Sequence, residues 1–394
     1  MTPAYPHDLF TDEALTEPHK HYRVLRDLGP VVWLEAHEVY AITRYDEARA
    51  ALLDAGTFCS GQGVALNEVM NRIGAGRSTL MTDGEPHELL RRVLARNITP
   101  RALNSLNDRV DALATDLVRE LVERGCFDAV VDLARALPLT VVPDVIGWPP
   151  DARDHLLEWA GATFDILGPL NERAQRAVPV AQAMFQFADE TAAHGNLRPG
   201  SVGAGVLDAA RRGEVEPEQV PPLLVGYLAP SLDTTISAIG NAMWLLATHP
   251  DQWEVLRADP SLVPNAFNET LRLESPIRAF SRVVTTETRV GDVDIPADAR
   301  VVIFYAAANR DERRFARPDE FDIRRTNAGE HLGFGLGVHS CAGQGLARME
   351  AHAILRAVVD QVESLELSGP PTLALNNIIN AWATLPLTVR PTPG

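Results

Sequence analysis

One cysteine of this chain lies in a sequence suited to holding a metal ion by its sulfur. Cys341 belongs to the stretch Phe334 to Gly343, whose sequence is FGLGVHSCAG. Its glycines permit the positive φ angles and close backbone approach of a tight loop. Apolar residues follow at helical spacing through Val362, so we expect a helix directly after the loop. N–H groups at the start of that helix point toward the sulfur, which lowers the pKa of a thiol and tunes a bound metal.

A lone cysteine is more often a buried structural residue than a metal ligand. Here six fixed residue types coincide within ten positions, which favours the metal ligand over the structural alternative. The other two cysteines, Cys59 and Cys126, lie far from Cys341 and from each other in the sequence. They predict neither a disulfide framework nor a zinc pair, and we interpret both as ordinary core or near-surface thiols.

A polar triplet interrupts the most apolar segment of the chain. We expect a long helix from Val220 to Leu246, with Asp233, Thr234 and Thr235 near its middle. Polar residues inside an apolar helix lower stability unless they are hydrogen-bonded or functional. The triplet is therefore a second candidate site.

The Cys341 loop resembles the haem-binding loop of the cytochrome P450 family, which has the pattern Phe-Gly-x-Gly-x-His-x-Cys-x-Gly. The resemblance implies haem b, an iron protoporphyrin IX, as the cofactor. Cys341 would be its axial thiolate, which favours O–O cleavage, in a loop that includes Phe334 and Gly335. The resemblance also implies that Thr234 holds the iron-bound dioxygen and a proton-donating water. Asp233 would connect this water to bulk solvent.

The long helix departs from the family pattern just before this acid–alcohol pair. The family has Ala or Gly and then Gly, whereas this chain has Pro230 and Ser231. Proline removes one i→i−4 hydrogen bond and predicts a kink, at a point where the family's helix is already distorted. Altered proton delivery, with uncoupling or better use of peroxide, is one interpretation. Ordinary monooxygenation is favoured, because Asp233 and Thr234 are both present.

Four cations match the family positions that bind the two haem propionates. His87 and Arg91 stand four residues apart on one helical face, Arg282 lies in the segment that passes beside the haem, and His339 precedes Cys341 by two residues. A planar guanidinium suits carboxylate pairing in a partly buried site.

A Glu-x-x-Arg motif is formed by Glu269 and Arg272. Such a pair shares a helix face, but surface pairs at this spacing are common and weak. The family adds a third polar residue from a later loop, which here is Arg325 in the stretch Phe315 to Arg325. We expect these three residues to stabilise the fold and to take no part in catalysis.

Helical patterns dominate the 394 residues, of which 46% are apolar and 23% charged. One helix is expected from Leu106 to Gly125, and a hairpin from Val31–Leu34 and Val39–Thr43. Further strands are expected at Val290–Ile295 and Arg300–Tyr305. The fold class is mainly α with small β-sheets, the cytochrome P450 fold, in a single haem-binding domain over residues 1–394.

The formal charge of −17 argues against nucleic acid as a partner, since phosphate neutralisation needs a basic surface. No run of 18 apolar residues and no signal-peptide pattern occurs, which predicts a soluble cytoplasmic protein without a membrane partner. Between Glu88 and Asp108 the charged residues are all basic. These arginines form either a solvated helix face or a docking patch for an acidic partner, and they are Arg91, Arg92, Arg96 and Arg101.

Nearly the whole chain resembles one bacterial branch of the family, which demethylates para-methoxybenzoate and related aromatic acids. That branch binds the substrate carboxylate with Arg and Ser side chains. The matching positions here are Gln62, Asn67, Val225, Gly226 and Ala229. A carboxylate in a pocket without a cation has a desolvation cost of several kcal/mol. We therefore expect a small, mostly apolar substrate that is neutral or phenolic.

The predicted substrate pocket combines apolar residues with three hydrogen-bonding side chains. Gln62, Asn67 and Tyr227 are expected to bind a phenol, carbonyl or ether. The apolar members are Val64, Leu66, Phe164, Ile166, Leu167, Ala229, Ile277, Phe280 and Ile379. Each of these, taken alone, is more often plain core.

Together these features predict an oxidoreductase, a haem-thiolate monooxygenase that inserts one atom of O2 by hydroxylation or O-demethylation. Electrons would come from NAD(P)H through a reductase and an iron–sulfur ferredoxin, since no Gly-x-Gly-x-x-Gly fingerprint follows a strand. A peroxide-driven peroxygenase and a natural-product hydroxylase or epoxidase acting on a terpenoid-like substrate are the alternatives. A gas sensor is disfavoured, because passive binding needs no proton relay.

Overall fold

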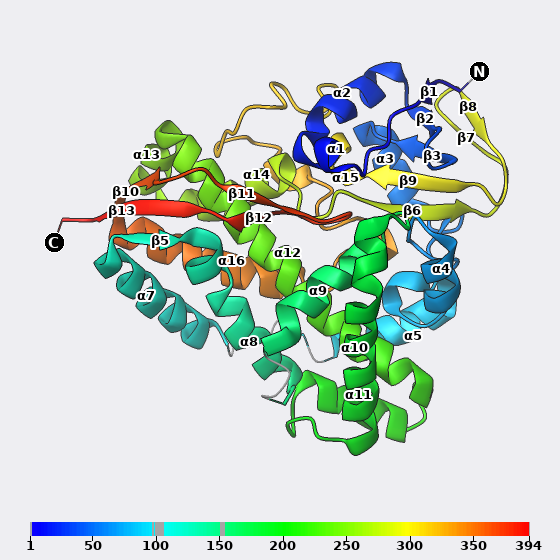
Figure 1. The fold of residues 1–394 in the computed structure, drawn as a ribbon, viewed down its shortest axis with the longest axis horizontal. Helices are drawn as coiled ribbons and strands as arrows, with labels where there is room; N and C mark the ends of the chain where they lie inside the picture. Colours follow the sequence, from blue (N-terminus) through cyan, green and yellow to red (C-terminus); the bar gives the residue numbers. More distant parts are fainter. Residues whose placement is uncertain (1, 97, 99–105, 150–153, 394) are drawn as a thin grey trace.

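The long apolar helix predicted from the sequence runs through the middle of the molecule, with other helices around it and small sheets at two sides (Figure 1). The computed structural model describes residues 2–96, 98, 106–149 and 154–393. The helices are α1 Asp12–Thr16, α2 Pro18–Leu28, α3 Tyr45–Leu53, α4 Glu68–Gly74, α5 Gly84–Ala95, α7 Asn107–Arg124, α8 Ala136–Ile146, α9 Leu156–Asp165, α10 Glu172–His194, α11 Val202–Arg211, α12 Val220–Thr248, α13 Pro250–Ala258, α14 Val263–Leu273, α15 Tyr305–Ala308 and α16 Gln344–Gln361.

The largest sheet has six strands in the order β1-β2-β3-β9-β6-β4. A second sheet pairs β10, β13 and β5, and β11–β12 and β7–β8 are two-stranded. The strands are β1 Ala4–Tyr5, β2 Val31–Leu34, β3 Val39–Ile42, β4 Phe58–Cys59, β5 Cys126–Asp128, β6 Ala279–Val284, β7 Thr288–Val290, β8 Val293–Ile295, β9 Arg300–Phe304, β10 Val362–Leu367, β11 Thr372–Leu375, β12 Asn380–Thr384 and β13 Pro386–Pro391.

Most predicted elements are confirmed, with shifts at their ends. Strands β2 and β3 form the expected antiparallel hairpin, with Val31 opposite Ile42. The stretch Val290–Ile295 is not one strand, because a turn divides it between β7 and β8, which pair with each other. Val362 begins β10 and lies outside the helix that follows Cys341.

Helix α7 illustrates how the local sequence sets an element. Its buried residues Val110, Ala114, Val118 and Leu121 repeat at three or four positions and face the core. Gly125 ends the helix with φ +73°, and its N–H donates to the carbonyls of Leu121 and Val122.

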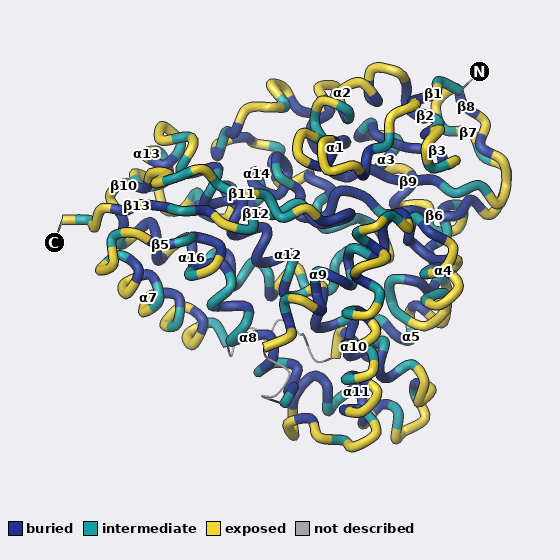
Figure 2. Tube along the Cα trace, in the orientation of Figure 1, coloured by how far each residue is buried: buried dark blue, intermediate teal, exposed yellow. Residues whose placement is uncertain are grey.

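Helix α12 is the central element of the main hydrophobic core. It packs against α8, α9, α10, α14 and α16, and the trace in Figure 2 shows it mostly buried. It is long and apolar enough to cross a bilayer, yet most of its residues are buried inside the protein, as in a core helix. The helix is uninterrupted across Pro230, so the proline predicted to kink it does not break it.

The Glu-x-x-Arg motif forms a buried ion network, as expected. Glu269 and Arg272 are fully buried on α14, with Arg272 Nε 2.7 Å from Glu269 Oε2. Arg325 Nε lies 2.9 Å from Glu269 Oε1. The guanidinium of Arg272 also donates to the carbonyls of Asn309 and Pro318, which connects α14 to the long segment before Cys341.

Candidate functional site

The Cys341 loop is held by backbone geometry that its glycines permit. Gly335 and Gly337 have φ of +65° and +71°. A Cβ at Gly337 would lie 2.7 Å from the carbonyl oxygen of Leu52, so the loop passes against the end of α3 at a distance that only glycine allows. The N–H of Cys341 donates to the carbonyl of Phe334 at 2.8 Å, which closes the loop just before α16.

The sulfur of Cys341 is surrounded by backbone N–H groups and by two arginine side chains. The backbone N–H groups of Gly343 and Gln344 point to it, as the sequence predicted. Burial nevertheless raises the pKa of the thiol, against these N–H groups and the cations of Arg91 and Arg348. The N–H groups lower the pKa of the thiol as expected, but burial outweighs their effect. A thiolate here needs a further counter-charge such as a metal ion, so the sulfur fits an iron ligand.

Two histidines from separate segments meet beside the loop. The rings of His87 on α5 and His339 have centroids 4.3 Å apart. His339 Nε2 lies 2.8 Å from Asp83 Oδ1. Although burial alone would raise it, hydrogen bonds from His339, Cys59 and Gly61 lower the pKa of Asp83 to about 2.

The four predicted propionate cations supply polar atoms suited to binding carboxylates. His87 Nε2 is buried and has no hydrogen-bond partner among the described residues. Burial, followed by the nearby cations His339 and Arg91, lowers the pKa of His87. Arg91 Nη2 donates to the carbonyl of Ser340 at 2.5 Å. Arg282 is buried, and no carboxylate within the described part of the chain pairs with it. A buried guanidinium and an unpaired imidazole nitrogen fit the acidic side chains of a haem.

The acid–alcohol pair lies on the middle of α12. Thr234 Oγ1 donates to the carbonyl of Pro230 at 2.6 Å, which leaves its oxygen lone pairs able to accept a further hydrogen bond. Pro230 is exposed although the neighbouring residues Leu228 and Ala229 are fully buried, so α12 borders an open space at this turn. Burial raises the pKa of Asp233 to about 7, against the lowering effect of Arg135 and with a further rise from Asp165.

Six of the predicted pocket residues are brought together from four separate segments. Ile277 and Ile379 form a β-bridge between the stretch after α14 and the turn before β12. One hydrophobic cluster includes Val64, Phe164, Leu167, Ile277 and Ile379, with Phe280 packed against it.

Two of the three side chains expected to hydrogen-bond the substrate, those of Asn67 and Tyr227, donate instead to backbone carbonyls of the protein. The side-chain amide of Asn67 donates to the carbonyls of Ile166 and Gly168 at 2.8 and 2.7 Å, so both its N–H groups are used. The hydroxyl of Tyr227 donates to the carbonyl of Leu94 on α5 at 2.7 Å. Neither residue retains a donor for a substrate.

The remaining members of the predicted pocket divide between clusters and the surface. Ala229 belongs to the main core around α12, and Ile166 packs with residues of α10. Leu66 packs against the cluster beside the large sheet, while Gln62 is exposed. Among the three predicted polar contacts, the side chains of Asn67 and Tyr227 are hydrogen-bonded within the protein, whereas that of Gln62 is exposed.

The three arginines after Glu88 that the structure describes lie in different settings. Arg91 turns toward the Cys341 loop, Arg96 pairs with Glu214, and Arg92 remains exposed on α5. Arg101 lies outside the described residues.

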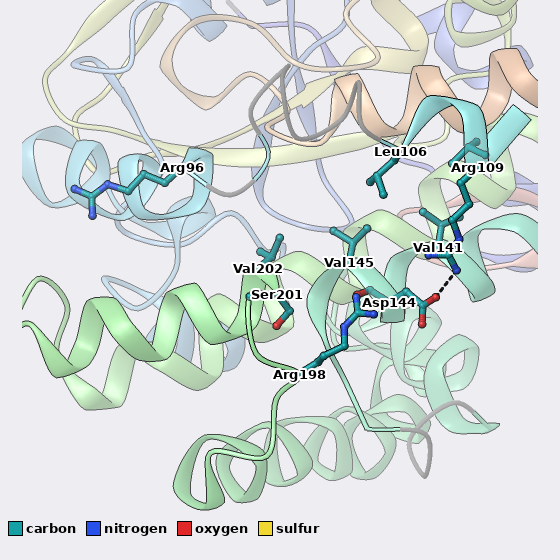
Figure 3. Close-up of a pocket in the computed structure, with 11 residues that line it drawn as sticks. Arg96, Leu106, Arg109, Val141, Asp144, Val145, Arg198, Ser201 and Val202 are labelled. Carbon is teal, nitrogen blue, oxygen red and sulfur yellow. Dashed lines mark hydrogen bonds and ion pairs between the residues drawn. The ribbon is translucent and has the colours of Figure 1, made fainter.

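A groove of about 340 Å³ lies at the start of α7, beside α8 and the segment that precedes α11 (Figure 3). Arg96, Arg109 and Arg198 line it, and Arg109 pairs with Asp144 at 2.7 Å. None of its lining residues belongs to the predicted site.

Comparisons with known proteins define the class of this molecule. The sequence pattern of the family described as Cytochrome P450 matches residues 211–373. The chain is 38% identical to the cytochrome P450 CYP199A2 of Rhodopseudomonas palustris, over 98% of this chain and 94% of that protein. The chain therefore belongs to the cytochrome P450 family, whose members are haem b monooxygenases that bind the iron through a cysteine thiolate.

More distant relatives have names that refer to other substrates or ligands. Cyclomarin C epoxidase CymV of Salinispora arenicola is 32% identical, over 90% of this chain and 91% of the relative. Among solved structures, cytochrome P450 CREJ in complex with (4-ethylphenyl) dihydrogen phosphate has a TM-score of 0.85 and 27% identity, over 95% of this chain and 98% of that one. These similarities confirm the fold predicted from the sequence.

Sequence reasoning missed two groups near the site. Arg348 on α16 stacks its guanidinium over the Phe334 ring at 4.9 Å and contributes positive charge at Cys341. Its position seven residues after Cys341, two helical turns along, was a usable signal. Asp165 on α9 influences Asp233, and nothing in its sequence context indicates this.

Proposed function

We propose that this cytochrome P450 inserts one atom of O2 into a small, mostly apolar substrate that is neutral or phenolic and aromatic, by hydroxylation or O-demethylation. The observation that carries the proposal is the apolar cluster of Val64, Phe164, Leu167, Ile277 and Ile379. In the sequence, these residues lie before, between and after the predicted haem-binding residues. None of them has a charged side chain.

Haem, when bound, supplies the binding and activation of dioxygen. In this proposal Cys341 would bind the haem iron through its sulfur, Phe334 and Gly335 shape its loop, and the Gly343 and Gln344 N–H groups would stabilise the thiolate. The cations His87, Arg91, Arg282 and His339 hold the propionates. Asp83 orients His339 through the 2.8 Å contact to Nε2.

Thr234 and Asp233 form the proposed proton relay. The hydroxyl of Thr234 donates to the carbonyl of Pro230, so its oxygen accepts a proton-bearing water. Because its pKa is raised to about 7, Asp233 is able both to hold and to release a proton near neutral pH.

The charge near the pocket supports a substrate without a carboxylate. Arg278 directly follows Ile277, but its Nη1 donates to the carbonyls of Asn376 and Ile379, and its Nη2 donates to Asn380 Oδ1 at 3.4 Å. Nη1 and Nη2 therefore have partners in the chain, whereas Nε is buried without one among the described residues. A ligand carboxylate could pair with the outer nitrogens of this guanidinium only by displacing those contacts.

Optical titration of the ferric holoprotein tests the substrate class. A fitting ligand displaces iron-bound water and shifts the Soret band. We expect 4-methoxytoluene and 4-methoxyphenol to bind at least about 100-fold more tightly than 4-methoxybenzoate, a difference of about 2.7 kcal/mol. Tight binding of the benzoate would refute the uncharged pocket.

A matched pair of variants sharpens this test. Gln62→Arg adds a cation at an exposed position that matches the carboxylate clamp of the demethylating branch, and Gln62→Ala is its control. We expect the arginine variant alone to gain affinity for 4-methoxybenzoate. Equal affinity in both variants would show that Gln62 does not face the ligand.

Electrons are proposed to arrive from a small iron–sulfur ferredoxin and its NAD(P)H-dependent reductase, in the cytoplasm. The exposed Arg92 on α5 and two exposed apolar residues near the Cys341 loop, Leu53 at 50% and Val338 at 56%, support docking on this face. Arg92→Glu should raise the KM for ferredoxin and weaken its salt dependence. Arg289→Glu, in the distant β7–β8 hairpin, should leave both unchanged.

A natural-product hydroxylase or epoxidase is the second candidate, supported by relatives with such names. A peroxide-driven peroxygenase is the third. Turnover with hydrogen peroxide at a rate above that with the ferredoxin system would favour the peroxygenase.

A further inference from the structure

The carboxyl group of Asp233 lies opposite a glycine of the neighbouring helix α9. Helix α9 packs along α12 (Figure 1). A Cβ built on Gly161 of α9 would lie 3.4 Å from Asp233 Oδ2. At this point the carboxyl group of Asp233 therefore packs against the backbone of α9. Because Gly161 has no side chain, it leaves space between Asp233 and the next turn of the helix.

That next turn of α9 carries a second acid. Asp165 follows Gly161 by four residues, so it shares the same face about 6 Å further along the helix. Its side chain is half-buried, and its Oδ1 accepts the N–H of Asn377 at 2.8 Å.

Polar contacts connect Asp165 to the protein surface. Asn377 Nδ2 donates to the carbonyl of Asp165 at 2.9 Å, and Arg173 Nη1 donates to Asn377 Oδ1 at 2.7 Å. Arg173 in turn pairs with Asp12, whose side chain is 74% exposed. A line of polar groups thus runs from Asp165, one turn beyond Gly161 on α9, to solvent.

Burial and the neighbouring charges together place the pKa values of both acids near neutral pH. Burial raises the pKa of Asp165 to about 6, against the lowering effects of the Asn377 N–H and of Arg173, Arg176 and Arg278. The neighbours that act on Asp233 are Arg135, which lowers its pKa, and Asp165, which raises it. Because a negative charge on one acid opposes ionisation of the other, the titrations of the two acids are coupled.

We propose that Asp165 is the outer acid of the proton path, carrying protons from solvent to Asp233 through water between α9 and α12. In each transfer the O–H bond of Asp165 breaks and an O–H bond forms on the Asp233 carboxylate. Asp165, left ionised, then takes a proton from surface water. This inference rests on the proposed role of Asp233 and extends it to a residue that the acid–alcohol pair does not include.

The test is Asp165→Asn in the holoenzyme, with 4-methoxytoluene, a bacterial ferredoxin and its reductase. An asparagine keeps the Oδ1 acceptor for Asn377 but carries no exchangeable acid proton. We expect kcat for ferredoxin-driven product formation to fall about 5- to 20-fold, with the substrate's Soret titration unchanged. The ratio of kcat in H2O to that in D2O should rise about twofold. Turnover with hydrogen peroxide, which brings its own protons, should be unchanged.

Three comparison variants make the outcomes distinguishable. Glu172→Gln removes an exposed carboxylate near Asp165 and should behave as the wild type, whereas Asp165→Glu should restore most of kcat. If Asp233→Asn slows ferredoxin-driven turnover but Asp165→Asn leaves kcat and the isotope ratio unchanged, the outer relay is refuted. If Asp233→Asn itself has no effect, the proposed function of the acid–alcohol pair fails first.

Discussion

Glu350 on α16 provides a stability test whose size follows from its surroundings. Its side chain is fully buried, and neither carboxyl oxygen has a hydrogen-bond partner among the described residues. It lies four residues after Leu346 and four before Ile354, in the middle of the apolar face of the helix. Burial raises the pKa of Glu350 from 4.5 to about 8. Glu350 is therefore protonated at neutral pH in the folded protein and ionised in the unfolded chain.

The sign and size of the pH effect follow from this difference. The folded state binds one more proton than the unfolded state between the two pKa values, so Glu350 makes stability fall as pH rises from 4.5 to about 8. Each pKa unit is 1.36 kcal/mol, so the loss between pH 5.5 and 8 is about 3 kcal/mol. For 394 residues, with about 2.1 cal/mol/K of unfolding entropy per residue, this corresponds to about 4 °C in Tm.

The assay compares Glu350→Gln with the wild type in far-UV circular dichroism melts at one scan rate, from pH 5.5 to 8.5. Glutamine has the same shape and stays neutral, so the Tm of the variant relative to wild type should rise by about 4 °C across this range. Asp360→Asn, at an exposed position on the same helix, should show a constant offset. A constant offset for Glu350→Gln as well would refute a protonated Glu350.

Three further substitutions test the parts that position the site. Gly337→Ala places a Cβ against a backbone carbonyl at positive φ, so the variant should bind less haem. Its ratio of Soret to protein absorbance should fall well below that of the control Gly329→Ala, in which the nearest atom to the new Cβ is 3.6 Å away. Glu269→Gln leaves Arg272 buried without its charge partner and should lower the free energy of unfolding by about 3–5 kcal/mol, measured by urea denaturation. Tyr227→Phe should cost about 1 kcal/mol in the same assay yet leave the Soret titration unchanged, because its hydroxyl binds α5.

The elements and the Cys341 loop were predictable because their signals are local. The glycine spacing before Cys341 and the apolar repeat after it lie within one short segment, and the φ angles of Gly335 and Gly337 match that expectation. Asn67 was misassigned for the opposite reason. Its partners, the carbonyls of Ile166 and Gly168, are about a hundred positions away in sequence, and only the folded chain brings them close.

Three buried or half-buried carboxyl groups show why a raised pKa does not by itself identify a functional acid. Burial raises the pKa of Asp165, Asp233 and Glu350 to about 6, 7 and 8. Neither carboxyl oxygen of Glu350 has a hydrogen-bond partner among the described residues, so no hydrogen-bonded route leads a proton away from it. Asp233 adjoins Thr234 on one side and α9 on the other, and Asp165 continues toward solvent through Asn377. In the relay proposed above, a path for the proton therefore distinguishes Asp233 and Asp165 from Glu350.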